Sequence, residues 1–137
     1  MADARNLNSA ELEALQAGLD LAARLANSDG PPSLDQVQIL YDAFLAEYID
    51  DSDAIIALSL AFGQCIVSSG PFEWVRCIDE YGDETSVSVV GTAIYIHPIS
   101  MIQKRLDSRE RVVIEQLCDD SLAQLAGLVN KGGYAKR

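Results

Sequence analysis

Histidine, tryptophan and positive charge are scarce in this chain of 137 residues. It has one histidine, His97, and one tryptophan, Trp74. A metal site built from several histidines is therefore excluded, and we assign no metal ligand, no cofactor and no catalytic residue. A nucleophile elbow, a phosphate-binding glycine loop and a Rossmann fingerprint are also missing. Enzymatic activity is thus left open, and the sequence favours a protein that is not an enzyme.

Basic residues are absent between Arg24 and Arg76, a stretch that holds eight acids, and the whole chain has a formal net charge of −11. Nucleic-acid phosphates and anionic lipid surfaces both require positive charge on the protein, so we expect neither as a ligand. The acidity permits a protein partner with a cationic surface. A plainer interpretation is that the charge keeps the protein dispersed, as a monomer or small homo-oligomer.

Cysteine pairs and export signals are missing as well. The three cysteines, Cys65, Cys77 and Cys118, are odd in number and form no CxxC motif. The N-terminus has no basic and apolar leader, and serines and glycines interrupt the uncharged run at 54–72, whereas a bilayer span takes roughly 20 apolar residues. We therefore expect free thiols in a reducing cytoplasm.

Helical periodicity marks the first half of the chain. Asn8 with Glu11, and Ser33 with Gln36, have the spacing of capping boxes. The acids at 50–53 precede a segment that is apolar on nearly all sides, so we interpret them as caps, with a divalent-cation site as the alternative. The predicted helices are residues 9–26, 34–49 and 54–67.

The apolar period then changes from helical to alternating. Gly91-Thr92 is typical of a type II′ hairpin turn and places Val89 opposite Ile94 and Val87 opposite Ile96. The predicted strands are 72–78, 85–90 and 92–97, followed by a helix at 99–106 and a last helix capped by Ser108. The result is an α+β fold: three N-terminal helices, a three-stranded antiparallel meander and two C-terminal helices. We expect one domain over 1–137, frayed at 1–7 and 131–137.

The stretch CIDEYGDE places Asp79, Glu80, Asp83 and Glu84 around Gly82. Its spacing is not that of a calcium-binding loop, and a solvated hairpin tip does not separate carboxyl pKa values as acid–base work requires. We therefore interpret it as a turn, with a metal or acid–base site as the less favoured alternative.

One face of the predicted sheet is polar and is a candidate binding site. If the first hairpin loop has an odd number of residues, Trp74 and Arg76 join this face; an even number places them beside Val87 and Val89. The plainer alternative is an ordinary half-polar face, and a catalytic one is the least favoured. The register implies no carboxylate beside the histidine, so we do not expect it to act as an essential base. The candidate residues are Ser86, Ser88, Tyr95, His97, Trp74 and Arg76.

The acids without neighbouring bases form a second candidate surface. Their fields add over roughly the Debye length of ~8 Å, which would steer a cationic partner toward the second helix and the start of the third. The residues proposed for this surface are Asp35, Asp42, Asp50, Asp51 and Asp53.

Residues 54–106 resemble a bacterial domain-of-unknown-function family, DUF thirty-eight-oh-six. The matching pattern is a helix that contains a Phe-Gly-x-x-Ile motif, then Trp-x₄-Asp-Glu-Tyr-Gly, then a Pro-Ile-Ser-Met segment followed by Lys-Arg. The resemblance implies a fold and a bacterial origin and lends no catalytic residues. The residues that carry it are Phe62, Gly63, Trp74, Asp79, Glu80, Tyr81, Gly82, Pro98, Ser100, Met101, Lys104 and Arg105.

Three functions remain as hypotheses. The first is a non-enzymatic protein-interaction module of adaptor or toxin-neutralising type. The second is a small-ligand binder or hydrolase that uses the polar sheet face, which a pocket beside His97 and a shifted histidine pKa would favour. The third is a structural subunit active only as an oligomer, which a large apolar patch on the sheet would favour.

The cysteine count yields a first prediction. Thiol titration of the denatured, unreduced protein should find three free thiols, because no export signal or paired spacing indicates a disulfide. Recovery of a single thiol would show a disulfide and contradict the assignment to a reducing compartment.

Overall fold

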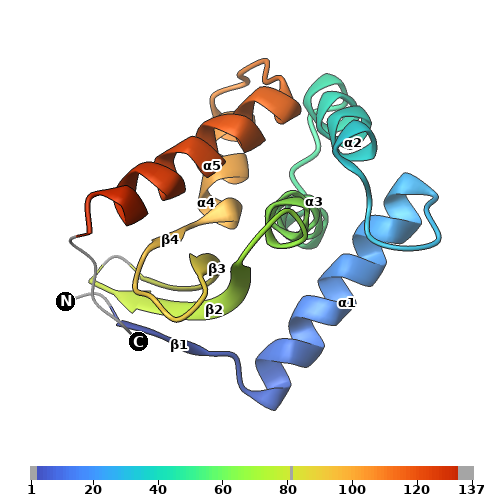
Figure 1. Cartoon of the computed structure of the whole chain (residues 1–137). Coiled ribbons are helices and arrows are strands. Elements are labelled where there is room, and N and C mark those ends of the chain that lie inside the picture. The colour runs from blue at the N-terminus through green and yellow to red at the C-terminus, as the bar shows by residue number, and fades with distance from the viewer. Residues whose placement is uncertain (1–2, 81, 133–137) are drawn as a thin grey trace.

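A computed structural model describes residues 3–80 and 82–132 (Figure 1). Over these residues the chain forms five helices and one antiparallel sheet of four strands in the order β1-β2-β3-β4. The α+β class is confirmed, and the sheet has one strand more than predicted. The elements are β1 (Asp3–Asn6), α1 (Ser9–Ala26), α2 (Leu34–Ala46), α3 (Ser52–Val67), β2 (Phe72–Asp79), β3 (Gly82–Val89), β4 (Tyr95–Ile96), α4 (Pro98–Asp107) and α5 (Ile114–Asn130).

The first two helices begin where their caps predict, and the third begins at Ser52, two residues before the predicted start. Asn8 and Glu11 form a reciprocal capping box at α1, and Ser33 and Gln36 form another at α2. The Asp51 carboxylate accepts the backbone N–H groups of Asp53 and Ala54, the second and third residues of α3. The interpretation of residues 50–53 as a capping segment is therefore confirmed at Asp51.

Strand β1 lies within residues 1–7, which the sequence predicted to be frayed. It pairs with β2 along its whole length. Arg5 holds it in place with a two-bond ion pair to Glu11, at 2.7 and 2.8 Å, and Arg76 of β2 lies 3.5 Å from the same carboxylate. The Arg5 hydrogen bond lowers the pKa of Glu11 to about 2. The strand is thus held by contacts with α1 and β2. Its sequence, Asp-Ala-Arg-Asn, is polar and lacks the alternating apolar pattern from which a strand would be predicted.

The hairpin of β3 and β4 has the predicted register with a different turn. Val87 pairs with Ile96 as expected. The turn closes with a 3.0 Å bond from the Thr92 N–H to the Val89 carbonyl, and Gly91 adopts a left-handed φ of 75°. Gly91 is therefore the third turn residue, so a type II′ loop of Gly91-Thr92 is wrong, and β4 is shorter than the predicted 92–97.

The connection from α4 to α5 folds back onto α2. Ser108 is the C-cap of α4, and the last helix begins only at Ile114, so Ser108 does not cap it as predicted. Gln38 of α2 satisfies the connection instead: it accepts the N–H of Ile114 at 2.6 Å and donates to the carbonyl of Val112 at 2.9 Å. The last helix is thus capped by a side chain distant in sequence.

Helix α3 is the centre of the packing, with α1 and α2 on one side and α4, α5 and the sheet on the others (Figure 1). Trp74 of β2 packs against it at Gly63, and its indole N–H donates to Gln64 at 2.9 Å. A methyl group at Gly63 would lie 2.4 Å from the indole and 3.0 Å from the ring of Pro98. This glycine therefore lets β2 and the start of α4 meet on α3.

Two sequence expectations concern thiols and membrane spans. Cys65, Cys77 and Cys118 form no disulfide. Burial raises the pKa of Cys65 to about 11, which keeps that thiol protonated and slow to react. In the part of the chain that the structure describes, no helix has both the length and the apolar character needed to cross a membrane.

The contact at Gly63 predicts a sign reversal between two glycine substitutions. Alanine normally stabilises a helix interior by about 1 kcal/mol over glycine, and Gly127→Ala in α5 should gain this because no atom lies within 4 Å of the added carbon. Gly63→Ala should instead lose a net ~1–2 kcal/mol, because overpacking against rigid rings costs about 1–3 kcal/mol. Urea unfolding of both variants measures the difference, and equal stabilisation would refute the role given to Gly63.

Candidate functional site

The first hairpin loop decides which predicted site residues meet. Asp79 pairs with Gly82, so the loop has an even number of residues, and Trp74 pairs with Val87. Trp74 and Arg76 therefore lie on the face that packs toward α1 and α3. Arg76 is held there by an ion pair with Asp83 and a 3.2 Å hydrogen bond to Thr85. The two residues serve packing and hairpin structure and do not reach His97.

The other four predicted residues do share the opposite face. Ser88 pairs with Tyr95, the Ser86 hydroxyl lies 2.8 Å from Nδ1 of His97, and the ring of Tyr95 meets that of His97 edge-on with centroids 5.3 Å apart. However, Ser86 and Ser88 have no exposed surface, so this face is not open as expected. Ser88 donates to the carbonyls of Val89 and Thr92, both at 3.0 Å, and thereby fixes the turn.

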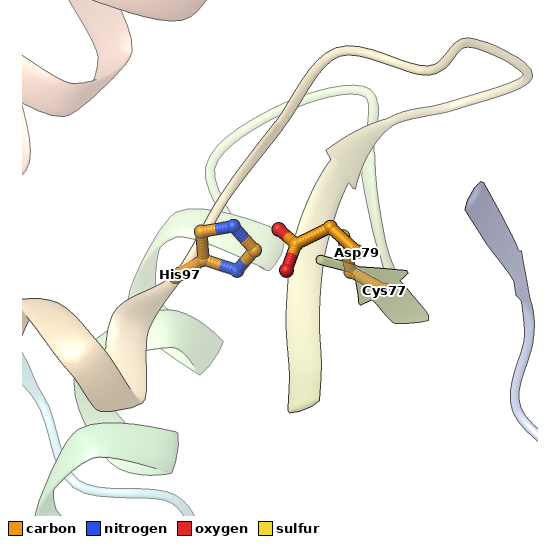
Figure 2. A group of neighbouring side chains, drawn as sticks. All are labelled: Cys77, Asp79 and His97. Atoms are coloured by element: carbon orange, nitrogen blue, oxygen red, sulfur yellow. The ribbon is translucent and has the colours of Figure 1, made fainter. Parts of the chain in front are cut away.

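A pocket of about 220 Å³ opens beside His97, lined by Cys77, Asp79, Gly82, Glu84, His97 and Ser100. Its carboxylates and thiol come from β2 and β3, and its imidazole comes from His97, the residue immediately before α4. Figure 2 shows the His97 ring and the Asp79 carboxylate facing one another, with Cys77 behind them on the strand.

Glu84 joins the pocket to α4. His97, at the N-cap position of α4, makes no side-chain cap, and Pro98 has no N–H to offer. The Glu84 carboxylate takes over this role from β3: it accepts the Ser100 hydroxyl at 2.8 Å and also the backbone N–H of Ser100. A negative charge at the start of a helix is favourable, so one function of Glu84 is structural.

His97 has a carboxylate neighbour, which corrects the sequence expectation. Oε1 of Glu84 lies 3.2 Å from Nδ1 of His97. The hydrogen bond to Glu84 raises the pKa of His97 against the opposing effect of burial. Burial in turn opposes, but does not outweigh, the hydrogen bonds from His97 and Ser100 that lower the pKa of Glu84. The pair is therefore most stable as imidazolium and carboxylate.

Cys77 and Asp79 complete the cluster from alternate positions of β2, which point to the same side of a strand. Cys77 is buried, and Asp79 accepts the N–H of Gly82 at 3.0 Å across the hairpin. Burial and a hydrogen bond to Cys77 raise the pKa of Tyr95 to about 12. One donor atom each from Cys77, Asp79 and His97 lie within 4.8 Å of one another.

Cys77, Asp79, Glu84 and Ser100 are not predicted as companions of His97. The signal for Cys77 and Asp79 is the parity of the first hairpin loop, whereas Glu84 shares the face of Ser86 by alternation along its own strand. An even loop places Cys77 opposite Glu84, on the face that holds Ser86. Ser100 had no such signal, because its position depends on how α4 leaves the sheet.

A pocket beside His97 and a shifted histidine pKa are both present, and these two features favour the small-ligand hypothesis. A serine-hydrolase arrangement, in contrast, is not supported by this geometry. In such a site the serine and the acid bond to different ring nitrogens. Here the Ser86 hydroxyl and the Glu84 carboxylate both approach Nδ1, at 2.8 and 3.2 Å, and Ser86 is fully buried. No proton relay through the ring connects them.

The predicted acidic residues Asp35, Asp42, Asp50, Asp51 and Asp53 are all exposed. Asp42 also lines a groove of about 610 Å³ between α2 and the α4–α5 connection, whose wall carries Arg109 and Arg111. Arg109 lies 3.7 Å above the ring of Tyr48. The predicted acidic surface therefore includes two bases that the sequence places far away.

The contact between Glu84 and His97 yields a prediction for the titration of His97, measured without added metal. Glu84→Gln should lower the pKa of His97, because the hydrogen bond to Glu84 is the largest effect that raises it and burial acts in the opposite direction. Because the folded pKa is raised, the pair stabilises the wild-type fold fully below the unfolded pKa, and this stabilisation is lost as pH rises through the folded pKa. NMR titration of the single histidine measures the shift.

Asp83→Asn is the matched control, because Asp83 lies on the same hairpin and pairs with Arg76. It should leave the His97 titration nearly unchanged. A His97 pKa that stays raised in Glu84→Gln would show that Glu84 is not its controlling partner.

Similarity to known proteins covers the elements that build this pocket. No curated protein matches the chain. A crystal structure from Bacteroides thetaiotaomicron VPI-5482 at 1.50 Å resolution has a TM-score of 0.72 with 12% sequence identity, over 88% of this chain and 47% of that one. This chain thus spans about half of that structure, and at this identity the likeness concerns the fold.

The family described as Domain of unknown function (DUF3806) matches residues 34–117, from the start of α2 into α5. This segment is wider than residues 54–106, which carry the resemblance in the sequence. Because the match covers more than half of the chain, the protein belongs to the DUF3806 family.

Proposed function

We propose that this protein is a non-enzymatic protein-interaction module that docks its partner on the groove between α2 and the α4–α5 connection. One observation carries the proposal. Among the described residues, the three most exposed large apolar side chains are Tyr48, Ile39 and Val113, at 71, 68 and 66%. Val113 lines this groove. Tyr48 stacks under Arg109, a residue of its wall, and Ile39 precedes Asp42, another lining residue, by three positions on α2.

The pattern on α2 supports a protein ligand. Asp35, Ile39, Asp42 and Ala46 follow helical spacing on one exposed stripe. Apolar anchors with a charged rim are typical of protein interfaces, where the anchors contribute most of the affinity. A small-ligand site is typically a concave, mostly apolar pocket with few polar groups, and it would lack this rim of charged side chains.

The expected partner is a protein segment that offers apolar side chains flanked by positive charge. Asp35, Asp42, Asp50 and Asp53 provide the complementary negative rim. Arg109 and Arg111 reduce this field locally and provide a place for an acidic residue of the partner. Three cysteines without a disulfide support a reducing cytoplasm as the compartment.

A photo-crosslinking residue at position 39 or 113, introduced in the native host, tests the docking surface. Both positions should capture the same protein. Position 90 is the control: Val90 is also exposed, but lies after β3 and bonds to Pro71, which lines a hollow at the far end of α5. Capture of a second copy of this chain alone, or equal capture from position 90, would contradict the proposal.

With the captured protein purified, Ile39→Asp should weaken binding at least about tenfold, as loss of an interface anchor does, whereas Val90→Asp should not. Asp50→Lys with Asp53→Lys should slow association at low salt. Asp51 is left unchanged because it caps α3. If the association rate changes neither with salt nor with these charge reversals, Asp50 and Asp53 do not contribute to docking.

A further inference from the structure

We propose that Cys77, Asp79 and His97 form a zinc-binding site in the pocket between β2 and the start of α4. Their donor atoms lie within 4.8 Å of one another. A tetrahedral zinc ion separates sulfur, nitrogen and oxygen ligands by about 3.2–3.8 Å, so small side-chain rotations bring the three into range. Cys77 and Asp79 occupy alternate positions of β2 and so point to the same side of the strand. His97 is the residue immediately before α4 (Figure 2).

The donor set selects the class of metal. A thiolate is a poor ligand for magnesium and calcium, which take oxygen ligands, and thiolate with imidazole suits zinc. With the thiol ionised, the thiolate, the carboxylate and the neutral imidazole balance the charge of a divalent ion. Three protein ligands leave a fourth position on the ion for water, and the pocket of about 220 Å³ has room for it.

The hydrogen bonds around His97 prepare it as a ligand. Ser86 donates to the Glu84 carbonyl at 3.4 Å, so its oxygen is left to accept a proton from Nδ1 of His97 at 2.8 Å. The Glu84 carboxylate lies 3.2 Å from the same nitrogen. Both contacts favour the tautomer with hydrogen on Nδ1, which leaves the lone pair on Nε2. Metal-bound histidines commonly donate their other N–H to a carboxylate in this way.

The charge of the pocket also favours a cation. Two carboxylates, Asp79 and Glu84, line it together with one imidazole, and of the described residues along its wall none is lysine or arginine. A partly buried excess of negative charge is costly unless it is paired or coordinates a metal. This site is independent of the groove on α2, so either proposal can fail without the other.

The test uses the full-length, untagged, reduced chain, stripped of metal and titrated with Co²⁺ and then Zn²⁺. We expect one Co²⁺ per chain with a thiolate-to-cobalt charge-transfer absorption, displaced by Zn²⁺. Cys77→Ser should abolish this absorption. Cys65→Ser is the matched control and should keep it, because Cys65 lies on α3, where its thiol contacts the carbonyl of Pro32.

Asp79→Asn guards against misfolding, because its amide oxygen can still accept the N–H of Gly82. It should reduce Zn²⁺ affinity by about 100-fold or more, beyond the 10–100-fold typical for groups that only orient a ligand. His97→Gln should do the same, and Glu80→Gln on the exposed loop should not. Co²⁺ binding without the charge-transfer absorption, or unchanged Zn²⁺ affinity in Asp79→Asn and His97→Gln, would overturn the proposal.

Discussion

The contact of Trp74 with Gly63 is the constraint on which the rest of the structure depends. It brings β2 against α3 at a single point, and the ring of Pro98 closes on the same glycine. Helix, sheet and the start of α4 therefore share one junction. The indole N–H bond to Gln64 fixes the rotation of the ring there. Even a methyl group at Gly63 would press on both the indole and the ring of Pro98 and force one of them to shift.

The geometry of the pocket follows from that junction. With Trp74 directed to α3, strand alternation sends Cys77 to the opposite face, where the register places Glu84 beside it. Pro98 at the junction fixes the preceding residue, His97, at the end of the sheet. Glu84 then caps α4 through Ser100 and meets His97 with its other oxygen. Stability and site chemistry thus share Glu84, so its replacement disturbs both.

Local signals in the sequence were sufficient for the helix starts and for one hairpin. Asn8, Ser33 and Asp51 cap as expected because a cap needs only residues within one turn. Strand β1, the capping of α5 by Gln38 and the meeting of Arg109 with Tyr48 are contacts between distant segments, which no local pattern encodes. The pocket was partly predictable. Which β2 residues face His97 depends on whether the β2–β3 loop has an even or an odd number of residues, and residue propensities do not determine this number.

The residues that carry the family resemblance divide by what they touch. Gly63, Trp74 and Pro98 make the junction on α3, and packing alone accounts for them. Asp79 and Ser100 line the pocket instead, where Ser100 holds Glu84 and Asp79 faces His97. A turn needs an acceptor for the N–H of Gly82, which an asparagine would also supply, so the turn does not explain a charge at position 79. The Asp79 charge helps to raise the pKa of His97, and the zinc site proposed for Asp79, Cys77 and His97 would use the same charge, so that the motif would describe both a scaffold and the site that it holds.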